Sequence, residues 1–476
     1  MDNNKTLINI SKKTFIQVTA LLLGLLIAAI ALTYVIPAGS FGEKADGSID
    51  YSIYYGLDDN RGIALWKGIL APFLVFFSGD GLTLIMLSLF LLVISAAFQV
   101  MNDAGGIRSL VGSVSERFKS RRKLMITLIS LLFMCFGAFL GLFEEMLTML
   151  PIITVLCLAV GYDSFTGFLI CIISCGFGFA SAITNPFTVL LASEIIGANP
   201  MENIWYRILV FIVMFLLLQG FIHLYLRRLG KDPENSYTYE HDRQLRSTAE
   251  TTDSSQKRSP AQVRKTRTVY TFFLLCSLLL ICICSFVPAI RSYTVVVLIA
   301  YFLIFGILSG VWCTASWKTV FKSFFSGLKG ALPTIVFIGL SASVKYVFDE
   351  GSVMPTIANQ INLLAQGKNI FLIALIVYAV VLVLEFFISS STAKAILVMG
   401  LLSTVSLGLS DQMSVLLYTF ADGYTNVLFP TSPVLLISLS MIGMEYFKWV
   451  KKSIPLFAVN LMLVILFIIL GIVIGY

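Results

Sequence analysis

Two Thr-Asn pairs interrupt long apolar stretches at matching positions in the two halves of the chain. They lie in ITNPF at residues 183–187 and in YTNVL at residues 424–428. Each follows, by about 40 residues, another polar interruption: GLFEE at 141–145 and FISSS at 387–391. Polar backbone breaks at membrane depth are tolerated only where they are buried in protein or line a water-filled site. Matched breaks in two halves therefore predict an internal repeat whose breaks meet at a binding site.

The composition places the chain in a membrane. Of its 476 residues, 58% are hydrophobic and 12% are charged, whereas about 25% are charged in a typical soluble protein. The eight cysteines lie in or beside apolar spans, where they are typical buried small hydrophobes. With only two histidines, neither in a credible ligand cluster, we expect no metal centre and no enzyme active site.

Long apolar segments predict an all-α polytopic membrane protein. Two of these segments, 123–160 and 369–408, are too long for one crossing and carry polar breaks, so we interpret them as re-entrant hairpins. Residues 61–79 read as an interfacial helix, and 315–327 repeat part of their sequence. The predicted crossings are 14–36, 81–101, 164–198, 204–226, 268–289, 293–312, 331–349, 412–444 and 453–475, with 164–198 and 412–444 as broken helices.

The basic residues predict the orientation of the chain. Lysines precede the first helix, and the segments 102–122 and 228–267 are rich in Lys and Arg, whereas 37–60 is acidic. Because basic loops stay in the cytoplasm, we expect a cytoplasmic N-terminus and an outside C-terminus in the cytoplasmic membrane. One unpaired crossing between the halves then makes the repeat an inverted one.

Four regions follow from this organisation. The first inverted-repeat half spans residues 1–227 and the second spans 293–476, with a linker helix in 268–292. Residues 228–267 form a basic cytoplasmic linker between them. Its polar composition cannot form a core, so we expect it to be flexible and dispensable for folding.

The four polar breaks should converge near the bilayer midplane. Half-helix N-termini suit carboxylates, whereas half-helix C-termini and unwound carbonyls suit cations. The candidate substrate-binding residues are Glu144, Glu145, Thr184, Asn185, Pro186, Ser389, Ser390, Ser391, Thr392, Asp422, Thr425, Asn426, Thr431 and Ser432.

Ionisable groups within these spans are costly and indicate function. Glu144 and Glu145 have no basic partner nearby in sequence, which favours a functional role. Glu385 and Lys394 are candidates for a buried ion pair, which either fixes the fold or takes part in binding. The repeat predicts that Asn185 and Asn426 face each other across the pseudo-two-fold axis, with a candidate Na⁺ site near both.

Several motifs resemble one known family. They are TYVIPAGSF at 33–41, EEM and LTMLP within 144–151, GYD at 161–163, NPFTV at 185–189, FADGYTNVLFPTSPVLL at 420–436 and YFKWVK at 446–451. Together they are similar to the YfcC-like branch of the anaerobic dicarboxylate carrier family, within a wider ion-transporter superfamily. The resemblance covers nearly the whole chain. It implies two hairpins, two broken helices, a scaffold part, a mobile transport part and often a homodimer.

The second hairpin departs from this pattern. The resemblance implies a sequence like NFFIPSGSGQA, whereas residues 385–395 read EFFISSSTAKA. Glu385 replaces an amide, Ser389 a proline and Lys394 a glutamine, so the ligand preference is expected to differ from that of relatives.

We therefore hypothesise that the protein is a secondary active transporter of a small carboxylate-bearing solute. An amino acid is the favoured substrate, with basic amino-acid antiport as one form of this transport. The carboxylate would bind at 389–392 and near Asn185 or Asn426, and a cationic group would face Glu144, Glu145 or Asp422. The alternative is Na⁺- or H⁺-coupled transport of a C4-dicarboxylate or a short-chain carboxylate. Apart from such a coupling ion we expect no cofactor. The expected partners are the small-molecule substrate and the lipid bilayer, and we expect no nucleic-acid partner.

Overall fold

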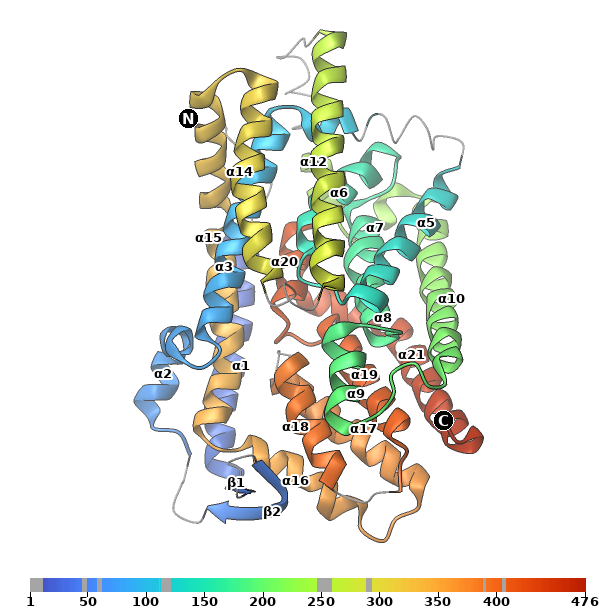
Figure 1. Ribbon diagram of the computed structural model, residues 1–476. Helices are drawn as coiled ribbons and strands as arrows, with labels where there is room; N and C mark the ends of the chain where they lie inside the picture. The colour runs from blue at the N-terminus through green and yellow to red at the C-terminus, as the bar shows by residue number, and fades with distance from the viewer. Residues whose placement is uncertain are drawn as a thin grey trace.

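The computed structural model describes residues 12–44, 49–57, 62–110, 112, 121–245, 259–287, 293–387, 391–404 and 408–476. These residues are mostly helical, and eight of their helices are long and apolar enough to cross a membrane. The chain is therefore a multi-pass membrane protein. Figure 1 shows the bundle that these helices form. The eight spans are Phe15–Val35, Gly81–Asp103, Arg122–Leu140, Ile204–Leu229, Thr294–Thr314, Trp317–Glu350, Ile370–Phe387 and Tyr446–Ile474.

Four helices from both halves of the chain pack side by side on one flank, at the left of Figure 1. Small residues allow these backbones to approach closely, as is common between membrane helices. At Gly327 the carbonyl oxygen accepts a 3.0 Å hydrogen bond from Ser95 Oγ, which is possible only because no side chain separates the helices. We call this group the four-helix body; it consists of α1 (Lys12–Val35), α3 (Gly81–Asp103), α14 (Thr294–Thr314) and α15 (Trp317–Glu350).

Apart from α12 (Pro260–Phe286), the remaining long helices belong to a second group, which we call the hairpin body. It contains the helices of the two predicted hairpins, two interrupted helices and two further spans, and it fills the right of Figure 1. The first unit and interrupted helix are α5 (Arg122–Cys135), η2 (Phe136–Leu140), α6 (Met146–Ala159), α7 (Ser164–Phe168), η3 (Leu169–Ile173), α8 (Ser174–Ala180), η4 (Pro186–Leu190) and α9 (Leu191–Ile196). The rest are α10 (Ile204–Leu229), α17 (Ile370–Phe387), α18 (Ser391–Thr404), α19 (Asp411–Asn426), α20 (Pro433–Met441) and α21 (Tyr446–Ile474).

Both predicted broken helices are interrupted where the sequence is polar. The first helix ends at Ala180 and resumes at Pro186, and the second ends at Asn426 and resumes at Pro433. Proline is well placed at a helix start because its missing N–H would have no intrahelical partner there. The predicted second break began at Asp422, which is wrong, because Asp422 lies within the last turn of α19.

The two interrupted helices cross in direct contact. A Cβ atom added at Gly423 of α19 would lie 2.1 Å from the backbone nitrogen of Ala180 in α8. Likewise, a Cβ atom at Gly176 would lie 2.2 Å from the side chain of Val427. Glycine at both positions thus allows the two breaks to lie next to each other in the core of the hairpin body.

The described residues are nearly all helical, as the predicted all-α fold requires, but the segment expected as a loop over 37–60 contains two strands. These are β1 (Ala38–Glu43) and β2 (Ile49–Leu57), an antiparallel pair with a register irregularity after Phe41. Aromatic and β-branched residues dominate β2, and such residues favour strands. The pair rests on α16 (Met354–Ala365), where Tyr54 Oη lies 2.9 Å from Thr356 Oγ1.

A second difference concerns residues 315–349, which we expected to form two helices. They form one continuous helix, α15, although the equivalent segment of the first half is split into α2 (Leu65–Leu74), η1 (Val75–Phe77) and α3. After a shared FFSG sequence the first half continues with Asp80 and Gly81, whereas the second continues with Leu328 and Lys329. Leu and Lys are strong helix formers and Asp and Gly are not, so only the first half turns here.

The prediction of a flexible linker over 228–267 is wrong at both of its ends. Helix α10 continues to Leu229, and α12 (Pro260–Phe286) begins inside the predicted linker. Residues 230–245, which we call the strap, include the short helix η5 (Pro233–Asn235) and helical residues 239–245. Residues 246–258 lie outside the described part of the chain.

The strap is docked by hydrogen bonds onto the start of α7. The carboxylate of Asp242 is buried and accepts the backbone N–H of Ser164 at 3.1 Å and the hydroxyl of Thr238 at 2.8 Å. Ser236 Oγ donates to Asp163 at 2.7 Å, so each of the two buried aspartates has a hydroxyl donor. Side-chain oxygen atoms of the strap thus accept hydrogen bonds from the free amide groups at the start of α7. The polar composition of the strap alone does not predict these hydrogen bonds.

Candidate functional site

A cluster of three buried charges lies where the second hairpin meets the second interrupted helix. The ammonium group of Lys394, in α18, forms ion pairs with Glu385 at the end of α17 and with Asp422 in α19. The three side chains are only 1%, 4% and 0% exposed, respectively. The predicted Glu385–Lys394 ion pair is thus present, and Asp422 joins it. With two carboxylates and one ammonium, the cluster carries one surplus negative charge when all three groups are ionised.

The carboxylate of Glu385 is only half satisfied. Its Oε2 atom receives Lys394 and the hydroxyl of Thr425, the latter at 3.3 Å. Its Oε1 atom is buried and has no hydrogen-bond partner among the described residues. An unsatisfied buried charged oxygen is costly and in native proteins indicates a missing donor or cation.

Glu385 also borders a small cavity with an empty volume of about 180 Å³. This cavity lies at the end of α19, whose last carbonyls provide a negative dipole end. It also lies beside the start of α20, where Ser432 Oγ accepts the N–H of Leu435 at 3.4 Å. The site therefore offers a cation-favouring wall and an anion-favouring wall within one polar cavity, lined by Glu385, Thr425, Asn426, Phe429, Thr431 and Ser432.

The break between α19 and α20 also contacts the four-helix body. Ser341 of α15 donates its hydroxyl to the carbonyl oxygen of Thr431. Within the break, the amide of Asn426 donates to the carbonyl oxygen of Asp422 at 2.9 Å, which caps the last turn of α19. The unwound segment is thus held from both sides, and a ligand in the cavity would contact backbone whose position depends on both bodies.

In the first half, Asn185 binds the protein itself. Its side chain is fully buried, donates to the Gly137 carbonyl at 3.1 Å and accepts the Phe187 N–H at 2.9 Å. The half-buried Thr184 donates its backbone N–H to the Ala138 carbonyl at 3.2 Å. Asn185 and Thr184 therefore attach the first hairpin to the break before Pro186, which is a positioning role. Direct contact of Asn185 with substrate, opposite Asn426, stays a prediction.

Glu144 and Glu145 lie at the turn of the first hairpin. This turn contains Gly141 at a φ of 69°, a left-handed conformation that glycine adopts without strain. Glu144 is exposed and Glu145 is half-buried. No ion pair joins either carboxylate to another described residue. Carboxylates that are exposed on such a turn fit a water-filled surface far better than a lipid-facing one.

The second hairpin turn is only partly described. Ser389 and Ser390 lie outside the described residues. Ser391 and Thr392 belong to the first turn of α18, without described side chains. Of the predicted binding residues, Thr425, Asn426, Thr431 and Ser432 line one cavity together with Glu385. Asp422 and the predicted residues of the first half are not among the described residues that line it.

Sequence reasoning missed Arg207 in α10. This arginine is 1% exposed, and its Nη1 donates to the carbonyl of Ala182, at the first break, over 3.4 Å. Arg207 places its positive charge at the C-terminal end of the half-helix α8, where the helix dipole favours a cation. Its neighbours Trp205 and Tyr206 suggested a membrane interface, which masked the signal of a basic residue within a span.

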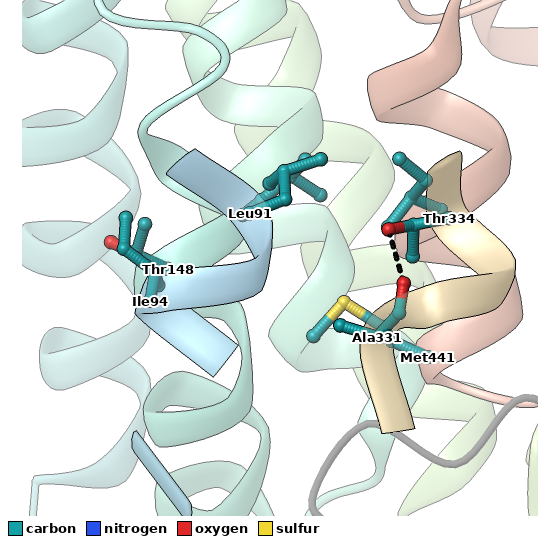
Figure 2. Close-up of a pocket in the computed structure, with 8 residues that line it drawn as sticks. Leu91, Ile94, Thr148, Ala331, Thr334 and Met441 are labelled. Carbon is teal, nitrogen blue, oxygen red and sulfur yellow. Dashed lines mark hydrogen bonds between the residues drawn. The ribbon is translucent and has the colours of Figure 1, made fainter. Parts of the chain in front are cut away.

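A second cavity, with an empty volume of about 280 Å³, is lined by residues of both bodies. In Figure 2, residues of α3 and α6 lie on one side of it, and residues of α15 and α20 lie on the other. Its lining is apolar except for two threonines; Thr334 donates to the Ala331 carbonyl, and Thr148 Oγ1 has no hydrogen-bond partner among the described residues. The lining residues are Leu91, Ile94, Leu147, Thr148, Ala331, Thr334, Ile437 and Met441.

The chain is similar to proteins of one family along nearly its whole length. The family profile of the C4-dicarboxylate anaerobic carrier (DcuC) matches residues 15–473. A protein of Escherichia coli strain K12 named "Putative basic amino acid antiporter YfcC" is 27% identical over 390 residues, which are 78% of this chain and 74% of that protein. An uncharacterised protein of Haemophilus influenzae is 24% identical over 496 aligned positions, covering 94% of this chain and 95% of that protein.

Among solved structures, the YdaH transporter of Alcanivorax borkumensis is similar over 96% of this chain and 99% of its own. The sequence identity is 14% and the TM-score is 0.41.

Proposed function

Because the chain belongs to the C4-dicarboxylate anaerobic carrier family, we propose that it is a secondary active transporter of amino acids that carry a cationic group. The relative from Escherichia coli, which is named for basic amino acid antiport, supports this choice of substrate. The observation that carries the proposal is the buried Oε1 atom of Glu385, which has no hydrogen-bond partner among the described residues and belongs to a residue lining a polar cavity.

The charge of the cluster favours a cationic group over a second carboxylate. When all three groups are ionised, Glu385, Lys394 and Asp422 together have one surplus negative charge, which an ammonium or guanidinium group of the substrate would neutralise. A dicarboxylate would add two negative charges to the same low-dielectric region, where like charges repel strongly. The α-carboxylate of an amino acid would bind the hydroxyls of Thr431 and Ser432 at the start of α20, where the helix dipole favours it.

A second candidate is Na⁺- or H⁺-coupled transport of a C4-dicarboxylate or short-chain carboxylate. The description of the family favours it, as does the anion-binding wall of the cavity at Thr431 and Ser432. In that case added cations would have to neutralise the surplus charge of the cluster before the substrate could bind.

The mechanism proposed for either substrate is alternating access, in which the hairpin body moves relative to the four-helix body. The cavity between the two bodies supports this movement, because its apolar lining provides few hydrogen bonds that would have to break. We further propose that the basic ends of helices α5, α10 and α12, around Arg121, Arg228 and Arg264, face the cytoplasm. The N-terminus would then lie inside and the C-terminus outside the cytoplasmic membrane. We include a homodimer in the same proposal. We also include transport that is driven either by exchange of substrates or by coupling to an ion.

Transport by purified protein in liposomes tests the substrate. Vesicles preloaded with unlabelled arginine, lysine, serine, succinate or buffer alone are tested for uptake of labelled arginine or labelled succinate, with and without Na⁺ and pH gradients. We expect arginine uptake that internal arginine or lysine accelerates and that succinate does not. Succinate uptake without arginine uptake would exclude the proposal and favour the second candidate.

Charge-removing variants in the same assay test the residues. Glu385→Gln should lower arginine uptake by at least about tenfold, because a charge-assisted hydrogen bond to substrate is lost. Glu144→Gln and Glu145→Gln should each reduce uptake while leaving insertion intact, since they keep the size of the side chain. Glu194→Gln, which removes an exposed carboxylate from α9, is the matched control and should transport normally.

A further inference from the structure

The ammonium group of Lys394 has the surroundings of a bound cation. Two carboxylates from two different helices, Glu385 in α17 and Asp422 in α19, bind it at the same time. All three side chains are at least 96% buried. The hydroxyl of Thr425 contacts the same Glu385 oxygen at 3.3 Å, so these contacts of the described residues around this point come from oxygen atoms. Oxygen-only surroundings with carboxylates are those that hard metal cations prefer in proteins.

A simple structural ion pair does not explain this arrangement. One carboxylate would suffice to neutralise Lys394, whereas the second one leaves a surplus negative charge in the interior of the protein, which is unfavourable. Glu385 and Thr425 line the cavity, and the Oε1 atom of Glu385 is buried without a hydrogen-bond partner in the described part of the chain. The cluster therefore combines one occupied cation position with an unsatisfied carboxylate oxygen beside it.

We propose that Glu385, Asp422 and Thr425 form a cation site whose resident cation is the side chain of Lys394, covalently attached to the second hairpin. Lys394 takes the place that a small coupling cation would otherwise occupy in the second half of the protein. The carrier then needs no added metal cation at this point, and the remaining negative charge is left for the cationic group of the substrate. This inference deepens the proposed function and concerns the same cluster.

The inference predicts that removal of Lys394 creates a site for free cations. The purified protein is heated in detergent in NaCl, LiCl, KCl or N-methyl-D-glucamine chloride at constant ionic strength, and its melting temperature is measured. The wild-type melting temperature should be equal in all four salts. Lys394→Ala should melt at a lower temperature in N-methyl-D-glucamine chloride, and one or more of the small cations should raise it by about 3–5 °C in a saturable manner.

Further variants separate a specific site from general salt effects. Lys394→Ala combined with Asp422→Asn lacks one of the two carboxylates and should lose most of the response to small cations. If Lys394→Ala fails to fold, Lys394→Ala combined with Glu385→Gln restores the wild-type net charge. That double variant should fold and keep a weaker cation response through Asp422 and Thr425.

Lys394→Cys provides a rescue experiment. Alkylation with 2-bromoethylamine converts the new cysteine into a lysine analogue and should restore both the wild-type melting temperature and its independence of the salt. The background for this variant lacks the eight native cysteines.

Two results would overturn the inference. One is a wild-type protein that Na⁺ or another small cation stabilises specifically, with loss of that effect in Lys394→Ala, because the cation would then bind beside Lys394 and not in its place. The other is a folded Lys394→Ala protein that melts at the same temperature in all four salts. No substrate is present in these measurements, so their outcome is independent of whether arginine or succinate is transported.

Discussion

At the scale of single residues, the imbalance between one ammonium and two carboxylates decides how the second hairpin responds to mutation. Lys394→Gln leaves Glu385 and Asp422 buried side by side without a counter-charge, so we expect a loss of about 3–5 kcal/mol in the free energy of unfolding. Glu385→Gln and Asp422→Asn each leave a neutral one-to-one pair, so we expect each to change stability by less than about 1 kcal/mol. Denaturant unfolding of the purified variants measures these differences.

The same series contains its own control. If Asp422 were peripheral and Glu385 were the only partner of Lys394, Asp422→Asn would be silent and Glu385→Gln would be as harmful as Lys394→Gln. The double variant Lys394→Gln with Asp422→Asn should recover part of the loss, since only one carboxylate then remains unpaired. Absence of any recovery would contradict the three-membered cluster.

How far single residues could be predicted from the sequence depended on where their partners lie in the chain. Glu385 and Lys394 were recognisable because they are charged, lie within one hairpin and are nine residues apart. Asp422 was recognised as an intramembrane charge but not as their partner, because nothing in the sequence specifies how closely α17 and α19 pack. Asn185 was predicted to bind substrate because of its position, yet its amide holds Gly137, a contact over 48 residues that no local pattern reveals.

At the scale of secondary-structure elements, the crossing of the two interrupted helices depends on Gly423. A methyl group there would overlap the backbone of Ala180, 2.1 Å away, and backbone cannot move aside as a side chain can. We expect Gly423→Ala to destabilise the protein by about 1–3 kcal/mol and to reduce transport, because α8 and α19 must separate.

Gly220→Ala is the matched control for this prediction. Gly220 lies within helix α10, and an added Cβ atom there would meet nothing within 4 Å. Alanine favours helices by up to about 1 kcal/mol relative to glycine, so this variant should be neutral or slightly stabilised. Thermal unfolding of both variants compares them, and an equal response would show that the two interrupted helices are not in tight contact.

The docking of the strap should depend on pH through Asp242. Burial raises the pKa of its carboxyl group to about 6, against an ordinary value of 3.8, despite the hydroxyls of Ser164 and Thr238 that donate to it. The docked state therefore binds a proton more tightly than the undocked state. Docking is strongest below about pH 4, weakens as the pH rises through the interval between the two pKa values, and is constant above pH 6.

Lowering the pH from about 7.5 to about 5 should thus stabilise the docked strap by on the order of 1–2 kcal/mol. Hydrogen exchange of residues 236–245, corrected for the intrinsic pH dependence of exchange, measures this change. Asp242→Asn should remove it, because an amide does not titrate. A pH response that persists unchanged in this variant would assign the titration to a group other than Asp242.

Element boundaries were predictable where the chain itself forces them. Pro186 and Pro433 restart helices after polar segments, and both breaks were expected from the polar residues that interrupt the apolar sequence there. The continuous helix α15 was not expected, because its apparent repeat of residues 64–79 hid the exchange of Asp80 and Gly81 for Leu328 and Lys329. The docked strap was not predicted, because the polar composition of residues 228–267 indicated only that they cannot form a hydrophobic core. It gave no information about side chains that cap a neighbouring helix.

At the scale of the whole molecule, the two bodies are each assembled from both halves of the chain. The four-helix body joins α1 and α3 with α14 and α15, and the hairpin body joins both hairpins and both interrupted helices. The matched polar breaks in the sequence predicted two related halves of the chain, one before and one after the basic linker. They did not predict which helices remain together, because this depends on packing between helices far apart in sequence.

If the bodies move relative to each other during transport, a covalent link between them should stop it. Thr334 in α15 and Met441 in α20 both line the cavity of Figure 2, and they belong to different bodies. In a background without the eight native cysteines, we expect Thr334→Cys with Met441→Cys to transport before treatment. A short bifunctional thiol reagent should then abolish uptake, and reductive cleavage of a disulfide-containing reagent should restore it.

A link within one body distinguishes movement between the bodies from general damage by the reagent. Phe98 in α3 and Phe302 in α14 both belong to the four-helix body, with ring centroids 5.9 Å apart. Phe98→Cys with Phe302→Cys, linked by the same reagent, should therefore transport as well after treatment as before it. Full transport by the linked Thr334 and Met441 variant would mean that α15 and α20 keep their contact throughout the cycle. Alternating access would then have to arise from movement of the hairpins alone, inside a body that is otherwise fixed to its neighbour.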